Sequence, residues 1–87
     1  MTSNATKTTL RNFLADCLAD ARDDQPFADD SSLFLTGRLD SLTMTRLILF
    51  LEDSFDIDFG KLGFDVELID SVDAAAALVD GNQLRRA

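Results

Sequence analysis

The sequence predicts an all-α fold, a four-helix bundle with a long first loop and a short third helix. Three observations favour it. Separate segments repeat apolar residues at the i, i+3, i+4 and i+7 spacing of one helical face, no segment has a strand pattern, and a long polar stretch follows the first helix. We expect the 87 residues to form a single domain, with its core over residues 8–81 and frayed tails at 1–7 and 82–87.

The first predicted helix follows Thr8 and Thr9, whose hydroxyls can accept a hydrogen bond as an N-cap. Its apolar stripe consists of Leu10, Phe13, Leu14, Cys17, Leu18 and Ala21. Because Cys17 lies within this stripe, we expect a small buried side chain there rather than a reactive thiol.

Residues 22–40 are predicted to form the long loop. The acids Asp23 and Asp24 and the single proline, Pro26, break the helical pattern, and turn-forming residues follow. A loop of this length in a compact domain is often functional. We expect it to be ordered, because five apolar residues can anchor it on the core: Phe27, Leu33, Phe34, Leu35 and Leu39.

The second predicted helix begins at Asp40 and Ser41, either of which can cap its first turn. Its apolar residues are Leu42, Met44, Leu47, Ile48, Leu49, Phe50, Leu51 and Phe55. Apolar residues on so many sides of one helix need to be covered by more than one neighbouring element. This helix is therefore predicted to lie at the centre of the bundle.

The remaining chain predicts a short third helix and a longer fourth one. Residues 64–68 allow only a turn or two of helix, and Ser71 is a suitable N-cap for the last helix, with Asp73 in its first turn. The narrow face of this helix consists of Val72, Ala75, Ala76 and Val79. Gly81 is expected to end it.

The composition argues against catalysis by this chain alone. Histidine is absent, which excludes a Ser-His-Asp catalytic triad and a Cys-His catalytic dyad. The single cysteine allows neither an internal disulfide nor a thiolate zinc cluster. The formal charge of −8 repels nucleic acid and anionic lipid. No apolar run approaches the ~20 residues of a membrane span, and the first residues lack the apolar segment of a secretory signal. We expect an acidic, cytoplasmic, monomeric protein that is not an enzyme and binds no metal.

The segment that carries chemical information is residues 37–42, which places the Ser41 hydroxyl at the start of a helix, just after the flexible Gly37. A phosphodiester on Ser41 would meet the unsatisfied amides and the partial positive charge of the helix terminus. Taken alone, however, Asp40 and Ser41 before an apolar run are the ordinary signature of an N-cap.

The order and spacing of these motifs resemble the acyl carrier protein family over Leu10 to Val79. The matching residues are Asp30, Ser32, Leu33, Phe34, Gly37, Asp40-Ser41-Leu42, Leu51 to Phe55, Ile69 to Val72, and Ala75-Ala76. The resemblance implies an acyl carrier protein-like bundle in which Ser41 receives 4'-phosphopantetheine from coenzyme A through a phosphodiester. The thiol of that arm would carry acyl intermediates as thioesters to partner enzymes.

The implied partners are a phosphopantetheinyl transferase and the ligases, synthases or transferases that activate acyl or aminoacyl groups. The residues expected to contact them are Asp40, Leu42, Thr43 and Arg46. In the family, the acid at the position of Asp40 helps to present the serine to the transferase. Fatty acid carriers usually have a strongly acidic second helix, whereas acids here follow only at Glu52 and Asp53.

These departures from the family pattern favour a discrete carrier of a specialised pathway, with polyketide, aminoacyl or modified lipid cargo. Thr43 and Arg46 are expected to be exposed, and Arg46 to oppose enzymes whose carrier sites are basic. Two further departures also favour a specialised carrier. Fatty acid carriers commonly have a small residue at the position of Leu39, and this chain has additional residues at 60–63.

Three alternatives compete with this interpretation. The chain could be an aminoacyl or peptidyl carrier with the same architecture. It could also be a small acidic interaction module without a prosthetic group, in which Asp40 and Ser41 only cap a helix. Asp56, Asp58 and Glu67 match positions 1, 3 and 12 of a calcium loop, but Gly60 stands at position 5, where the turn needs glycine at position 6.

Overall fold

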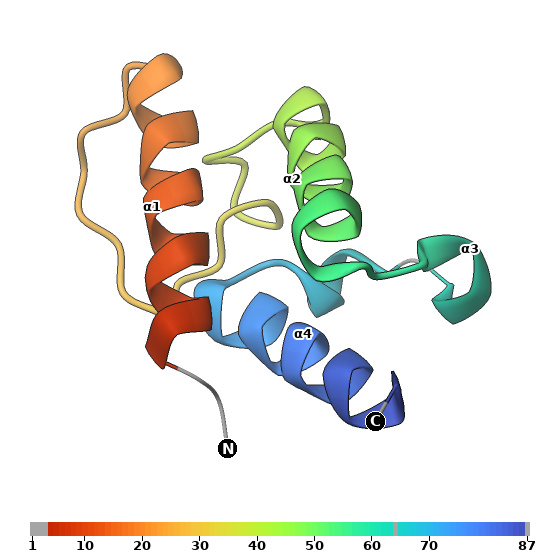
Figure 1. Cartoon of the computed structure of the whole chain (residues 1–87). Helices are drawn as coiled ribbons and strands as arrows, with labels where there is room; N and C mark the ends of the chain where they lie inside the picture. The colour runs from red at the N-terminus through yellow and green to blue at the C-terminus, as the bar shows by residue number, and fades with distance from the viewer. Residues whose placement is uncertain (1–3, 64, 87) are drawn as a thin grey trace.

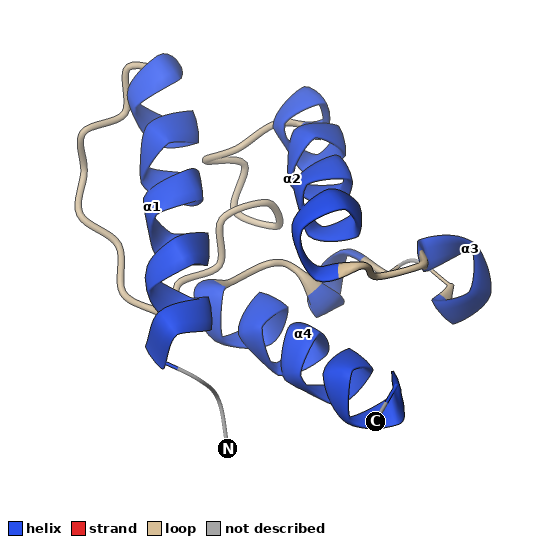
Figure 2. Cartoon of the chain, in the orientation of Figure 1, coloured by secondary structure: helices blue, strands red, loops and turns tan. Residues whose placement is uncertain are grey.

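A computed structural model of the chain describes residues 4–63 and 65–86. Its elements, in chain order, are α1 (Asn4–Asp20), α2 (Ser41–Phe55), α3 (Phe59–Leu62), the 3-10 turn η1 (Val66–Leu68) and α4 (Val72–Arg86). Figure 2 shows helices joined by loops, and the described residues contain no strand. The all-α prediction is therefore confirmed, and the chain forms a small helical bundle.

The three long helices enclose a single apolar core. α1 packs against α2 and α4, and α4 also contacts η1, so that in Figure 1 α1 and α2 lie side by side with α4 below them. The buried apolar residues are Leu10, Leu14, Cys17, Leu18, Leu33, Phe34, Leu39, Leu47, Leu51, Ile57, Phe59, Ile69, Val72, Ala75, Ala76 and Val79. The narrow face predicted for α4, Val72, Ala75, Ala76 and Val79, is buried in this core. None of the described helices combines the length and apolar character needed to cross a membrane.

The outer ends of α1 and α4 differ from the prediction. α1 begins at Asn4 rather than after Thr8 and Thr9, and the Thr9 hydroxyl donates to the carbonyl of Ala5, 2.9 Å away, as a residue inside a helix can. α4 continues through Gly81 to Arg86, because Gly81 does not adopt the positive φ of a helix stop. Both helices thus extend into the segments expected to be tails.

An additional short helix, which the sequence did not predict, precedes the predicted helical turn. It is α3, in the glycine-containing stretch that follows Asp58, and the Asp58 carboxylate accepts the amides of Gly60 (2.9 Å) and Lys61 (3.3 Å) as its N-cap. The segment predicted to form a turn or two of helix contains one such turn, the 3-10 turn η1, and Phe64 lies outside the described residues. Asp58 thus has a structural role in the segment that resembles a calcium loop.

The long loop descends along α1 and returns between α1 and α2 (Figure 1). Asp29 attaches the loop to α1 and to the start of α4, because the Asp29 carboxylate pairs with Arg11 at 2.8 Å and the Asp29 carbonyl accepts the amide of Asp73 at 2.9 Å. On the return path Leu33, Phe34 and Leu39 are buried, as predicted, and Phe27 packs partly against the core. The prediction for Leu35 is wrong: its side chain is 62% exposed.

Candidate functional site

Ser41 is the first residue of α2, and its side chain is exposed. The cap belongs to Asp40, whose carboxylate accepts the amide of Thr43 at 2.9 Å. Within residues 4–63 and 65–86, the Ser41 hydroxyl makes no hydrogen bond. The structure therefore decides between the two capping residues that the sequence left open, and it leaves the Ser41 hydroxyl available to a reagent.

Electrostatics at this helix start favour negative charge. Hydrogen bonds from the amide and the hydroxyl of Thr43 lower the pKa of Asp40 below its usual value, so Asp40 is ionised at neutral pH. Its charge lies at the positive end of α2. The first-turn amides of a helix have no intrahelical acceptor, and they also favour an anion at Ser41.

Another Asp-Ser pair, Asp70-Ser71, lies at the start of α4, and there the serine rather than the aspartate is the cap. The Ser71 hydroxyl accepts the amide of Ala74 at 3.1 Å and is the cap, as predicted. The Asp70 carboxylate points to the long loop instead. The same dipeptide therefore has a free hydroxyl before α2 and a bonded one before α4.

The neighbours of Ser41 on α2 differ in exposure. Leu42 is 71% exposed and Leu49 is 57% exposed, and because they are seven residues apart they share one face of α2. Thr43 is buried, which contradicts the prediction that it is exposed. It lies four residues before Leu47 and so belongs to the inward face, a spacing that the sequence already contains.

Arg46 is exposed, as predicted, but it is not isolated. Its guanidinium pairs with the carboxylate of Asp20, the last residue of α1, at 3.5 Å, and the two side chains are 46% and 68% exposed. Exposed pairs of this kind are weak and are screened by salt. Arg46 therefore contributes positive charge to the face of α2 near Ser41, partly balanced by Asp20.

Arg38, which the sequence analysis did not single out, connects the approach to Ser41 with the end of α1. Its guanidinium donates to both carboxylate oxygens of Asp23, at 3.1 and 3.2 Å, and to the carbonyls of Gln25 (2.8 Å) and Pro26 (3.3 Å). The next residue, Leu39, is buried, and its amide donates to the carbonyl of Leu33 at 2.9 Å.

Asp70 is a structural residue whose loop contacts the sequence did not predict. Its buried carboxylate accepts the Ser32 hydroxyl and the amides of Leu33, Phe34 and Leu35. Burial raises the pKa of Asp70, but these hydrogen bonds together lower it below its usual value. The sequence signals were the place of Asp70 in the matching segment Ile69 to Val72 and its acidic side chain beside the apolar Ile69 at the start of a helix.

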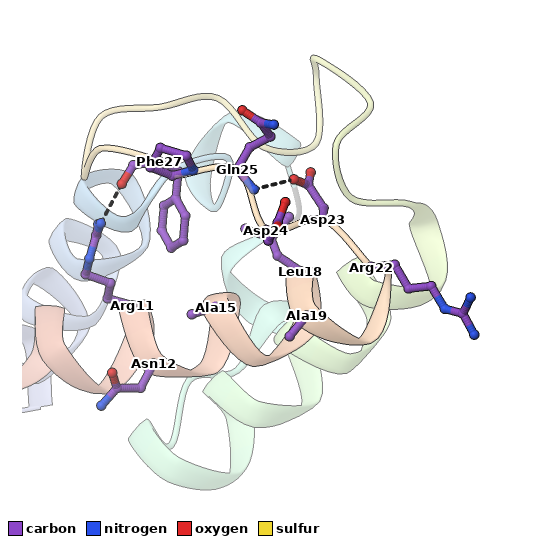
Figure 3. A pocket seen from close by; sticks show the side chains of 11 residues that line it. Arg11, Asn12, Ala15, Leu18, Ala19, Arg22, Asp23, Asp24, Gln25 and Phe27 are labelled. Atoms are coloured by element: carbon purple, nitrogen blue, oxygen red, sulfur yellow. Dashed lines mark hydrogen bonds between the residues drawn. The ribbon is translucent and has the colours of Figure 1, made fainter.

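A cavity of about 660 Å³ lies apart from Ser41, between α1 and the segment that follows it (Figure 3). It is lined by Arg11, Asn12, Ala15, Leu18, Ala19, Arg22, Asp23, Asp24, Gln25, Pro26 and Phe27. The Arg11 guanidinium lies 4.3 Å from the centre of the Phe27 ring and bonds to the Phe27 carbonyl. Ser41 is not among the lining residues, so this cavity is not the site of its chemistry.

Cys17 is buried among the apolar residues of α1. Burial raises the pKa of its thiol, which disfavours the reactive thiolate. The predicted small buried side chain is confirmed. Within the part of the chain that the structure describes, no three His, Cys, Asp or Glu side chains come together in a group that could hold a metal ion.

Comparisons of the chain with models of known protein families, with curated proteins and with solved structures found no match.

Proposed function

We propose that this chain is a carrier protein in which Ser41 is modified with 4'-phosphopantetheine and holds acyl intermediates as thioesters. The observation that carries the proposal is that Asp40, not Ser41, caps α2. The Asp40 carboxylate accepts the amide of Thr43, and the Ser41 side chain is exposed. A serine that capped its own helix would instead have one lone pair of its hydroxyl oxygen engaged by a first-turn amide.

The residues at this helix start fit a phosphodiester. Ser41 supplies the oxygen nucleophile, and the first-turn amides favour the negative charge of the product. In the transfer, the Ser41 oxygen loses its proton and bonds to phosphorus, while the pyrophosphate bond of coenzyme A breaks and releases adenosine 3',5'-bisphosphate. In this proposal a separate transferase binds coenzyme A and supplies the base. When attached, the arm supplies a thiol that forms the thioester.

The surface next to Ser41 supports docking of partner enzymes. Leu42 and Leu49 are exposed on one face of α2, which begins at Ser41, so a partner that packs against them also faces the serine. We assign the transferase and the acyl- or aminoacyl-activating enzymes to this face. Asp40 and Arg46 would lie beside it, whereas Thr43 acts through the cap of α2.

The test is the intact mass of the protein after incubation with coenzyme A and a broad-specificity phosphopantetheinyl transferase. We expect an increase of one phosphopantetheine in the wild-type protein and in Ser54→Ala, and none in Ser41→Ala. Ser54 is a matched control because it is an exposed serine on the same helix, also preceded by an aspartate. An unchanged mass for the wild-type chain, under conditions that modify a known carrier, would contradict the proposal.

The thiol of the arm gives a second readout. Cys17 is buried, so the native unmodified protein should react slowly with a thiol reagent, and the modified protein should show one fast thiol. Loading that thiol with amino acids in preference to acyl groups would identify the aminoacyl or peptidyl carrier. A chain that is never modified would leave the acidic interaction module as the function.

A further inference from the structure

We infer that Arg38 is a positioning residue that holds Ser41 in place for modification, a role that rests on the proposed function. Only Leu39 and Asp40 separate Arg38 from Ser41. A movement of the backbone at Arg38 therefore also displaces the hydroxyl of Ser41.

The hydrogen bonds of Arg38 reach four acceptor atoms on three residues of one short segment, residues 23–26. The two bonds to Asp23 use both carboxylate oxygens, and the bonds to the Gln25 and Pro26 carbonyls extend the contact along the backbone. Hydrogen bonding by Arg38 lowers the pKa of Asp23, so the pair is charged at neutral pH. A forked guanidinium can hold several acceptors at once, which a lysine cannot do.

Two neighbouring residues thus hold the approach to α2 from different sides. Leu39 is fixed in the core and to the Leu33 carbonyl, and Arg38 is fixed to the surface segment after α1. Just before them, Gly37 has a φ of 81°, a conformation that glycine adopts readily. Arg38 therefore restrains the chain next to its most permissive backbone position.

The Arg38 contacts add little to the core. The Arg38 and Asp23 side chains are 23% and 22% exposed, and neither belongs to the apolar cluster. The contacts hold a surface segment to the chain leading to Ser41, and displacement of a reacting group by about 1 Å can change a rate by up to about 100-fold. Loss of Arg38 should therefore affect the presentation of Ser41 more than the stability of the bundle.

The experiment compares Arg38→Gln and Arg38→Lys with Arg46→Gln. Arg46 is a matched control because it also pairs with an acid near the end of α1, but from within α2. Three quantities are measured: amide hydrogen exchange of the unmodified protein by NMR, Tm, and kcat/KM for modification by the transferase. Arg38→Lys keeps the charge and provides a folded variant if Arg38→Gln unfolds.

We expect both Arg38 variants to exchange the amides of residues 38–43 about tenfold faster while amides of α4 keep wild-type exchange, and to lower kcat/KM about tenfold. Arg46→Gln should leave residues 38–43 unchanged. Wild-type exchange at residues 38–43 in both Arg38 variants, or a uniform loss of protection that includes α4, would overturn the inference. An unmodified wild-type chain would refute the proposed function instead, and the exchange data would still decide whether Arg38 orders Ser41.

Discussion

The Asp70 carboxylate accepts the amide of Phe34 at 2.7 Å, across a separation of 36 residues. This bond joins the start of α4 to the middle of the long loop, and the Asp70 backbone carbonyl adds a second connection by accepting the amide of Leu33 at 2.9 Å. Leu33 in turn accepts the amide of Leu39. A chain of hydrogen bonds therefore runs from α4 through the loop to the residues just before Ser41.

Replacement of Asp70 should destabilise the protein strongly. Asp70→Ala leaves the amides of Phe34 and Leu35 without their acceptor, while the Leu33 amide keeps its bond to the Asp70 backbone carbonyl. We expect this loss to lower the free energy of unfolding by about 3 kcal/mol. Asp70→Asn keeps one acceptor oxygen and should cost about half as much. Urea denaturation at neutral pH measures both. Asp30→Asn, at an exposed loop position, is the control and should change stability by less than about 0.5 kcal/mol; an Asp70→Ala variant as stable as this control would contradict the role of the carboxylate.

Acid should weaken the same connection. The pKa of Asp70 is lower in the folded chain than its usual value, because the hydrogen bonds outweigh the effect of burial. Its contribution to stability is therefore fully present above the ordinary carboxyl pKa of about 4 and is lost as the pH falls through the lower, folded value. The difference in unfolding free energy between wild type and Asp70→Asn should shrink as the pH is lowered from 7 to 3. A difference that stays constant to pH 3 would place the folded pKa elsewhere.

Local patterns were enough to predict much of the fold. The apolar spacing of α1 and α2, the cap at Asp40 or Ser41 and the cap at Ser71 all depend on residues within one or two helical turns. The errors occurred where a local signal was weak or had a competitor. Gly81 costs a helix only about 1 kcal/mol relative to alanine, which a helix can tolerate, and the hydroxyl of Thr9 bonds inside α1 instead of capping it.

The site was predictable only as far as sequence neighbours determine it. Ser41 and Asp40 followed from the helix start, and the burial of Thr43 was available from its spacing to Leu47. The roles of Arg38 and Asp70 depend on partners 15 and 36 residues away. No periodicity or motif reports such pairs, because they arise from the path of the long loop.

Asp40 should matter more for modification than for folding. In Asp40→Asn the amide oxygen can still accept the Thr43 amide, so Tm should change little, whereas the charge beside Ser41 is lost. We expect kcat/KM for the transferase to fall about tenfold, as for loss of a charged contact at a docking surface. Asp58→Asn, at the cap of α3, is the matched control and should be modified at the wild-type rate. Modification of Asp40→Asn at that same rate would exclude a role for the charge, and unfolding of the variant would show that its role is structural.

Arg46 should influence the choice of partner. Its positive charge lies on the exposed side of α2, one turn after Ser41, and it opposes an enzyme whose carrier site is basic, because like charges slow association. Arg46→Glu should raise kcat/KM with a basic fatty acid synthesis enzyme by about threefold to tenfold at low ionic strength, and lower it with the cognate enzyme. The effect should decline at high salt. Asp20→Asn is the complementary control: it removes the partner of Arg46, so it should slow the basic enzyme further. Indifference of both enzymes to Arg46→Glu across a range of ionic strength would show that this arginine is only an exposed helix residue.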